Sequence, residues 1–372
     1  MKQQQKILQG NCLDVLKTLD DNSIDAIVTD PPYGLFHAGA RGHREAVEVL
    51  KAWAGGDWEY QPRLKHGYQG SDWDAFVPSP AVWAECLRVL KPGGHIVAFA
   101  GSRTIHLMGV GLSLAGFEIR DSLVWIHGNG FPRSLDYGNE IKKMGDEELG
   151  QLYWDFRSEL KTSNEPMILA RKPLSEPSIS KNIMEHGTGA LNVGDCRFGD
   201  FKQKKNGSPT GRAMLAGAHS VEHLRELAAR GAKMPDGKSA RTTLKRVETW
   251  QERQAKTPVS KPGRWPGNVI IDDDVAGELN IKASYFFHPR VQKNEIPKTY
   301  AANGDLIQHQ TVKPIGLMEW LVKLVTPPGG TVLDPFAGSG STLVGARNGN
   351  FAAIGIEIDP DYVALAQSRL EH

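Results

Sequence analysis

The stretch Thr331-Val332-Leu333-Asp334-Pro335-Phe336-Ala337-Gly338-Ser339-Gly340-Ser341-Thr342 decides the fold. Its first three residues read as a buried strand, its two glycines permit a tight turn, and a helix is expected over Ser341–Asn348. A second strand, Ala352–Glu357, and a helix over Asp361–Leu370 follow. This alternation of strand, glycine turn and helix predicts a doubly wound α/β sheet, whose ligand crevice lies at the carboxyl ends of its strands.

The same rhythm of strands and helices occurs near the start of the chain. The elements expected there are Ile24–Thr29, Pro80–Leu90, His95–Ala100, Ser102–Leu114 and Glu118–Ile126. Between about residues 130 and 300 the rhythm is lost, apart from short strand candidates at Met167–Ala170 and Val269–Ile271, and it returns with a helix at Ile315–Val325. We therefore expect residues 1–130 and 308–372 to be two halves of one Rossmann-like, mostly parallel sheet, with 131–307 as an irregular insertion.

Charge is distributed unevenly along the 372 residues. The net charge is +1, yet Phe201–Trp265 holds 15 Lys or Arg against 5 Asp or Glu. Such asymmetry predicts a basic surface on an acidic body, typical of a partner rich in phosphate. The alternative is a solvated linker, because Lys233–Pro262 is poor in apolar residues.

Cysteine content and hydropathy exclude several classes of protein. The three cysteines, Cys12, Cys86 and Cys196, lie far apart, which indicates neither a disulfide framework nor a metal cluster. The first ten residues are too polar for a signal peptide, and no apolar run is long enough to span a membrane. We expect a cytoplasmic protein that needs no metal.

Two carboxylates near the glycine turn indicate the kind of cofactor. Asp334 would repel a pyrophosphate, but it suits a cofactor that carries positive charge, such as the sulfonium and amino groups of S-adenosylmethionine. Glu357 ends the next strand, where a carboxylate can accept hydrogen bonds from both ribose hydroxyls. An ordinary strand-to-helix turn would require neither acid.

Asp30-Pro31-Pro32-Tyr33 follows the apolar strand Ile24–Thr29 and has the features of an amine-binding site. Asp30 and the Pro31 carbonyl can accept the two N–H groups of an aromatic amine and aim its nitrogen lone pair at an electrophile. The Pro31-Pro32 pair stiffens the turn, and Tyr33 offers a stacking face for a base. The alternative is a surface turn, which the preceding buried strand disfavours.

Together the two motifs resemble the beta group of amino-methylating DNA methyltransferases, in which the target-amine motif precedes the cofactor motif. Aspartate at position 30 is usual for adenine-N6 members, whereas many cytosine-N4 members have serine. The segment Gln308–Pro314 resembles that family's His-Pro-Thr-x-Lys-Pro, with Gln310 in place of proline, and Gly10-Asn11-Cys12 resembles a common Gly-Asp-Cys.

The resemblance implies roles for individual residues. It implies a catalytic group of Asp30, Pro31, Pro32 and Tyr33. Thr311 and Lys313 are expected near the methionine carboxylate, and Asn11 near the adenine of the cofactor. The full set expected at S-adenosylmethionine is Asn11, Cys12, Asp30, His309, Thr311, Lys313, Asp334, Pro335, Phe336, Ala337, Gly338, Ser339, Gly340, Ser341, Thr342 and Glu357.

The resemblance also implies an activity. We expect a site-specific methyltransferase that transfers a methyl group by direct in-line attack to N6 of an adenine flipped out of double-stranded DNA. Cytosine N4 is the nearest alternative; RNA or protein-amide methylation and an inactive DNA-binding regulator are further ones. A homodimer is expected, and the recognised sequence and any partner restriction nuclease stay open. The insert Leu35–Asp74, basic and aromatic, is either a DNA clamp or a lid or dimer contact.

Overall fold

The computed structural model describes residues 4–34, 40–62, 74–128, 135–198, 221–234, 237–256, 264–272, 275–276, 298–300, 306–308 and 312–371. The chain divides into two compact units. One consists of Met1–Cys196 with Pro266–His372, and the other of Arg197–Trp265. Within the described residues no helix is long and apolar enough to cross a membrane.

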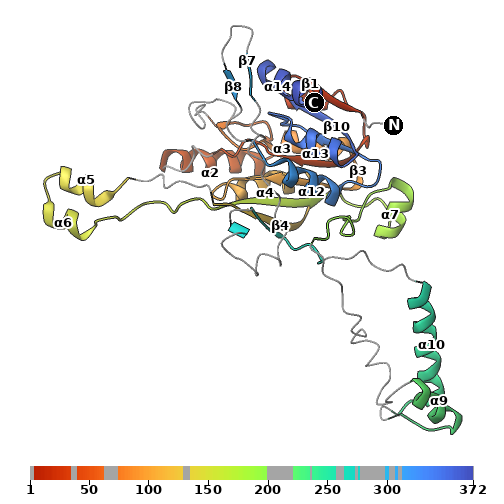
Figure 1. Ribbon diagram of the computed structural model, residues 1–372. Coiled ribbons are helices and arrows are strands. Elements are labelled where there is room, and N and C mark those ends of the chain that lie inside the picture. The colour runs from red at the N-terminus through yellow and green to blue at the C-terminus, as the bar shows by residue number, and fades with distance from the viewer. Residues whose placement is uncertain are drawn as a thin grey trace. The chain divides into compact units, whose positions relative to one another are not determined.

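An eight-stranded sheet forms the centre of the first unit (Figure 1). Its strand order is β1-β10-β9-β2-β3-β5-β4-β6. Its strands are β1 Gln5–Gln9, β2 Ile24–Thr29, β3 Leu90–Phe99, β4 Glu118–Ile126, β5 Asn164–Arg171, β6 Val269–Ile271, β9 Thr331–Asp334 and β10 Ala352–Glu357. All neighbours are parallel except β5, which is antiparallel to both β3 and β4. A separate antiparallel pair joins β7 Lys298–Tyr300 to β8 Leu306–Gln308. The expected doubly wound, mostly parallel sheet is confirmed.

Helices cover both faces of the sheet, because its central strands are apolar on both sides. Every residue of β2 is buried, with Ile27 facing one core and Ala26 and Val28 facing the other. The first core contains helices α1 Cys12–Leu16, α2 Ala40–Ala54, α3 Pro80–Val89 and α4 Ile105–Leu114. The second contains α12 Ile315–Val325 and α13 Ser341–Asn348. Helix α14, Pro360–Glu371, packs against β1 and α13.

The strand order reverses between β9 and β2. From β9 the chain continues outward to β10, and from β2 it continues outward to β3 on the opposite side. Such a reversal opens a crevice at the carboxyl ends of the two central strands. It is here that the structure brings the two sequence motifs together.

The sheet extends beyond residue 130, where we expected the insertion to begin. β5 and β6 are part of it, because the apolar runs at Met167–Ala170 and Val269–Ile271 are buried against β4 and β3. Along the chain, helices α5 Tyr137–Lys143 and α6 Glu147–Leu152 come after β4 and before β5, and α7 Ile179–His186 follows β5. β3 also begins earlier than expected, at Leu90. Residues 91–94, which we left between the expected helix and strand, form an irregular part of β3, with Gly93 at φ +78 and a register shift against β2.

The second unit contains two packed helices, α9 Val221–Ala229 and α10 Ala240–Lys256. They share a small apolar core formed by Leu224, Ala228, Met234, Ala240 and Val247. Helix α10 therefore makes up more than half of the stretch Lys233–Pro262, which we had considered as a possible linker, and it has buried residues.

In the insert that follows the catalytic motif, one aromatic residue has a structural role. Trp53 is fully buried, meets the ring of Phe76 edge-on at 5.8 Å and donates a hydrogen bond to the Tyr60 carbonyl. The Trp53 ring therefore belongs to the core, and the role of the insert as a DNA clamp, lid or dimer contact stays a prediction. Residues 35–39 and 63–73 of the insert lie outside the described part of the chain.

Candidate active site

The ends of β2 and β9 are joined by a side-chain hydrogen bond across the switch point. Ala26 and Ile27 pair with Val332 and Leu333. The two parallel strands consequently end together, and the Thr29 hydroxyl donates to Asp334 at 2.7 Å. The residues that continue from these strands, Asp30 and Pro335, open onto the same cavity.

Asp334 organises the start of the glycine turn. Its carboxylate accepts hydrogen bonds from the hydroxyls of Thr29 and Thr342 and from the backbone N–H of Phe336. Only 2% of the residue is exposed, and this burial raises its pKa to about 6 despite the three donors. Asp334 thus fixes the geometry of the turn and carries a titratable charge at the cavity wall.

Glu357 connects the end of β10 to the glycine turn. One carboxylate oxygen accepts from the N–H of Gly338 at 2.8 Å and the other from the N–H of Asp359 at 2.8 Å. Burial raises the pKa of this carboxyl, while the two backbone donors oppose the shift. Each oxygen retains a lone pair that could accept from a ligand hydroxyl.

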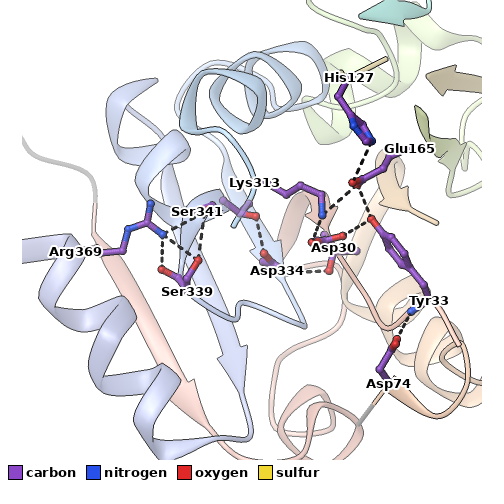
Figure 2. A network of polar contacts seen from close by, with 12 residues as sticks. Asp30, Tyr33, Asp74, His127, Glu165, Lys313, Asp334, Ser339, Ser341 and Arg369 are labelled. Atoms are coloured by element: carbon purple, nitrogen blue, oxygen red, sulfur yellow. Dashed lines mark hydrogen bonds and ion pairs between the residues drawn. The ribbon is translucent and has the colours of Figure 1, made fainter. Parts of the chain in front are cut away.

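The turn itself is tightly packed. Gly340 has φ +78, and a Cβ there would lie 2.9 Å from the Cβ of Ala366. Arg369 of α14 donates to the carbonyl of Ser339 at 2.7 Å and reaches the hydroxyls of Ser339 and Ser341 (Figure 2). No side-chain cap satisfies the first amides of α13, so its N-terminus can serve a ligand.

Asp30 lies in a cluster of four polar side chains that converge from separate parts of the chain (Figure 2). One of its oxygens accepts from the Tyr33 hydroxyl at 2.7 Å, and the other accepts from the Lys313 ammonium at 2.5 Å. Glu165, at the start of β5, accepts from the same two groups, at 3.0 Å from Tyr33 and 3.2 Å from Lys313. His127 lies beyond it, with Nε2 3.8 Å from Glu165.

The pKa values of Asp30, Glu165 and Lys313 depend on their burial and on the charges of their neighbours. Burial raises the pKa of Asp30 more than Lys313 lowers it, and the charge of Glu165 adds to the rise. For Glu165, burial is outweighed by Lys313 and by the hydrogen bond from Tyr33, so its pKa is lowered. Burial would lower the pKa of Lys313, but its two carboxylate neighbours raise it, and the ammonium stays charged.

The turn formed by Asp30, Pro31, Pro32 and Tyr33, which we expected to be catalytic and call the catalytic turn, has its backbone held from two sides. Asp74, which is buried, accepts from the N–H groups of Tyr33 and Gly34 at 2.8 and 3.2 Å. The Thr104 hydroxyl donates to the Tyr33 carbonyl at 2.6 Å. These bonds hold the backbone of Tyr33, and the hydrogen bond from its hydroxyl to Asp30 orients the ring.

One cavity of about 960 Å³ connects the two motifs. Its lining includes the catalytic turn, the glycine turn, Glu357 and the segment 158–165 that leads into β5. Ligand sites commonly have roughly 300–1,000 Å³, so this cavity has room for a nucleoside-sized cofactor and part of a second molecule. Within the described residues no group of three His, Cys, Asp or Glu side chains could hold a metal ion.

The structure places most of the expected cofactor residues on this cavity. Asn11 and Cys12 line it, although the Asn11 side chain also caps α1 by accepting from the N–H of Leu13. Asparagine caps a helix as well as aspartate does, which accounts structurally for Asn11 at this position. Burial raises the pKa of Cys12 to about 11, so its thiol stays protonated at neutral pH.

Lys313 was expected beside the methionine carboxylate of the cofactor. Lys313 lines the cavity, and its ammonium lies between Asp30 and Glu165, 5.5 Å from the centre of the Tyr33 ring. Its place beside the methionine carboxylate stays a prediction. His309 and Thr311 lie outside the described residues.

Glu165 was absent from our sequence-based site. It stands in Asn164-Glu165-Pro166, directly before an apolar strand. An acid at the start of a strand reaches the carboxyl edge of a parallel sheet only when that strand runs antiparallel. Strand direction is not readable from the local pattern, so the only signal was an acid beside a buried run.

The cavity brings together Asp30, which we expected to bind an amine, and the glycine turn, which we expected to bind a cofactor. The chain belongs to the DNA methylase family, whose sequence profile covers residues 24–368. The predicted resemblance to amino-methylating DNA methyltransferases is thereby confirmed. Membership also supports S-adenosylmethionine as the cofactor.

The chain is also similar to individual known proteins. Type II methyltransferase M.HindIII of Haemophilus influenzae is 24% identical over 379 residues, which cover 95% of this chain and 91% of that protein. Type II methyltransferase M.ScaI of Streptomyces caespitosus is 41% identical over 143 residues, 32% of this chain and 45% of that protein. The solved structure of PvuII DNA methyltransferase (cytosine-N4-specific) superposes with a TM-score of 0.49 at 14% identity, covering 99% and 87% of the two chains.

Proposed function

We propose that this protein transfers a methyl group from S-adenosylmethionine to N6 of an adenine flipped out of double-stranded DNA. The observation that carries the proposal is the single cavity shared by Asp30–Tyr33 and the turn at Asp334–Thr342. Aspartate at position 30 favours adenine N6 over cytosine N4. RNA, protein amides and a purely regulatory role fit less well, because the chain belongs to a DNA methylase family and keeps both motifs.

The residues of the glycine turn would hold the cofactor. Glu357 would accept the ribose hydroxyls through its remaining lone pairs, and the uncapped amides of α13 would meet the methionine part. Asp334 would place negative charge near the cationic end of the cofactor. The cofactor supplies an electrophilic methyl group.

The catalytic turn would act on the base. Asp30 and the Pro31 carbonyl accept the two N–H groups of the amine, so the nitrogen lone pair points toward the methyl group. Tyr33 provides a stacking face for the flipped base, and its position is fixed by Asp74 and Thr104. Transfer is then direct, and no residue needs to form a covalent intermediate.

Asp30→Ala tests the catalytic role of that carboxylate. It should abolish methyl transfer and leave S-adenosylmethionine affinity within a few-fold of wild type, because Asp30 acts on the amine in the transition state. Asp20→Ala, at an exposed position, is the matched control and should retain full activity. Transfer of radiolabelled methyl groups at a near wild-type rate by Asp30→Ala would remove Asp30 from the mechanism.

The methylated nucleoside shows whether the target base is adenine or cytosine. Mass spectrometry of digested DNA from expressing cells should detect N6-methyladenine, and N4-methylcytosine alone would overturn the choice of base while leaving the class of reaction intact. Duplexes with a mismatched target base should bind more tightly, because an unpaired base costs less to extrude. Equal affinity for matched and mismatched duplexes contradicts flipping.

We also propose that the protein acts as a homodimer, so that two basic units meet one duplex. Light scattering at micromolar concentration should give twice the mass of the chain. A monomer both with and without DNA rules the dimer out.

A further inference from the structure

Glu165 has no part in the mechanism above, yet it contacts two of the groups that surround Asp30. The Tyr33 hydroxyl has one proton and two carboxylate acceptors, Asp30 at 2.7 Å and Glu165 at 3.0 Å. The Lys313 ammonium likewise lies 2.5 Å from Asp30 and 3.2 Å from Glu165. Without substrate, therefore, both oxygens of Asp30 are already occupied by donors that the amine must displace.

We propose that Glu165 is a positioning residue that draws the Tyr33 hydroxyl and the Lys313 ammonium away from Asp30 when the target amine binds. A small movement of each donor suffices, because both already lie within reach of Glu165. Asp30 then has a free oxygen for the amine, and neither Tyr33 nor Lys313 is left buried without a partner. This inference rests on the proposed function, since it concerns the amine that Asp30 would bind.

The charges support an exchange of this kind. Asp30, Glu165 and Lys313 together carry one negative charge, which would balance the positive charge of the amine between methyl transfer and the loss of its proton. Among the described residues, the titratable groups that interact with Asp30 are Tyr33, Glu165, Lys313 and Asp334, and His127 interacts with Glu165. Glu165 raises the pKa of Asp30 through its charge, and Lys313 lowers it. Removing the Glu165 charge should therefore lower the pKa of Asp30 and bind Lys313 more tightly to it.

Glu165→Gln is the first test, because it keeps the shape of the side chain and removes its charge. We expect kcat to fall roughly ten- to hundred-fold, since misplaced groups cost rates of this order, while S-adenosylmethionine affinity is unchanged. The acidic limb of the kcat profile should move to lower pH. In cofactor-free protein, carboxyl carbon NMR should show Asp30 titrating at lower pH than in wild type, a result that does not depend on activity.

Glu118→Gln is the matched control. Glu118 begins β4 and pairs with Arg171 at the opposite end of β5, so it tests loss of a carboxylate on the same strand pair away from the cavity. Its kcat and its pH profile should equal those of wild type. A change of the same size and kind in both variants would show that Glu165 acts through general stability, and would overturn the proposal.

The double variant Glu165→Gln/Lys313→Met shows whether Glu165→Gln lowers kcat by leaving Lys313 on Asp30 or by impairing folding. It retains one negative charge on Asp30 and removes the ammonium that would otherwise remain there. We expect its kcat to exceed that of Glu165→Gln by about ten-fold or, if that single variant cannot be purified, to lie within about a hundred-fold of wild type. A double variant that falls short of these rates, or a single variant with wild-type kcat and an unshifted Asp30 titration, contradicts the role of Glu165. Absence of methyl transfer by wild-type protein on DNA would instead refute the proposed function.

Discussion

Gly340→Ala should destabilise the protein through two separate effects. Gly340 has φ +78, a conformation that costs a non-glycine residue roughly 1–2 kcal/mol. The new methyl group would also lie 2.9 Å from the Cβ and 3.3 Å from the Cα of Ala366, so helix α14 would have to move. Overpacking of this kind costs about 1–3 kcal/mol, and we expect a total loss of roughly 2–5 kcal/mol.

Gly329 provides a control for the cost of a positive φ without a steric clash. Gly329 has φ +74, and a Cβ there would meet no atom within 4 Å. Gly329→Ala should therefore cost only about 1 kcal/mol. Urea unfolding followed by tryptophan fluorescence would give both free energies of unfolding, with similar denaturant slopes as the check that the transitions are comparable.

A double variant isolates the contact with α14. Ala366→Gly should lose about 1 kcal/mol alone because of helix propensity. In combination with Gly340→Ala it should recover roughly 1 kcal/mol or more, because the closest clash disappears. Equal losses for Gly340→Ala and Gly329→Ala, together with additive free energies in the double variant, would refute the packing argument. The affinity for S-adenosylmethionine should fall in Gly340→Ala and stay unchanged in Gly329→Ala.

Three further predictions concern charged residues. Burial raises the pKa of Asp334 from 3.8 to about 6, so the protein takes up a proton on folding between these pH values, and the free energy of unfolding increases as the pH falls from 6 to 4. Asp334→Asn should therefore increase the free energy of unfolding more at pH 7 than at pH 4.5, as measured by urea titration. An equal increase at both pH values would contradict this prediction. Glu357→Ala should weaken S-adenosylmethionine binding in calorimetry, and unaltered affinity would place the ribose elsewhere. The basic residues of the second unit should contact DNA phosphates. A triple replacement by Gln at Arg230, Lys233 and Arg246 should flatten the slope of log DNA affinity against log salt by about 0.9 for each lost phosphate contact, whereas the same replacement at Lys6, Lys17 and Lys181 of the first unit should leave the slope unchanged. Identical slopes in the two triple variants would mark the second unit as a linker.

The sequence by itself determined the fold class and the two halves of the site. Apolar runs followed by Asp30-Pro31-Pro32-Tyr33 and by the turn at Gly338 and Gly340 are local patterns, and the carboxyl ends of parallel strands meet at one edge of a sheet. The contact between Thr29 and Asp334 follows from that rule once β2 and β9 are neighbours. Helix α10 was missed, because its apolar residues are sparse and gain their burial only against α9.

Only the tertiary structure decided which groups surround Asp30 and in which direction they shift its pKa. Glu165 reaches Asp30 because β5 runs antiparallel to its neighbours, and strand direction depends on pairing across the sheet rather than on local periodicity. Lys313 joins them from a segment 283 residues away from Asp30. Electrostatic effects depend on distances and burial, and these exist only after distant segments have packed together.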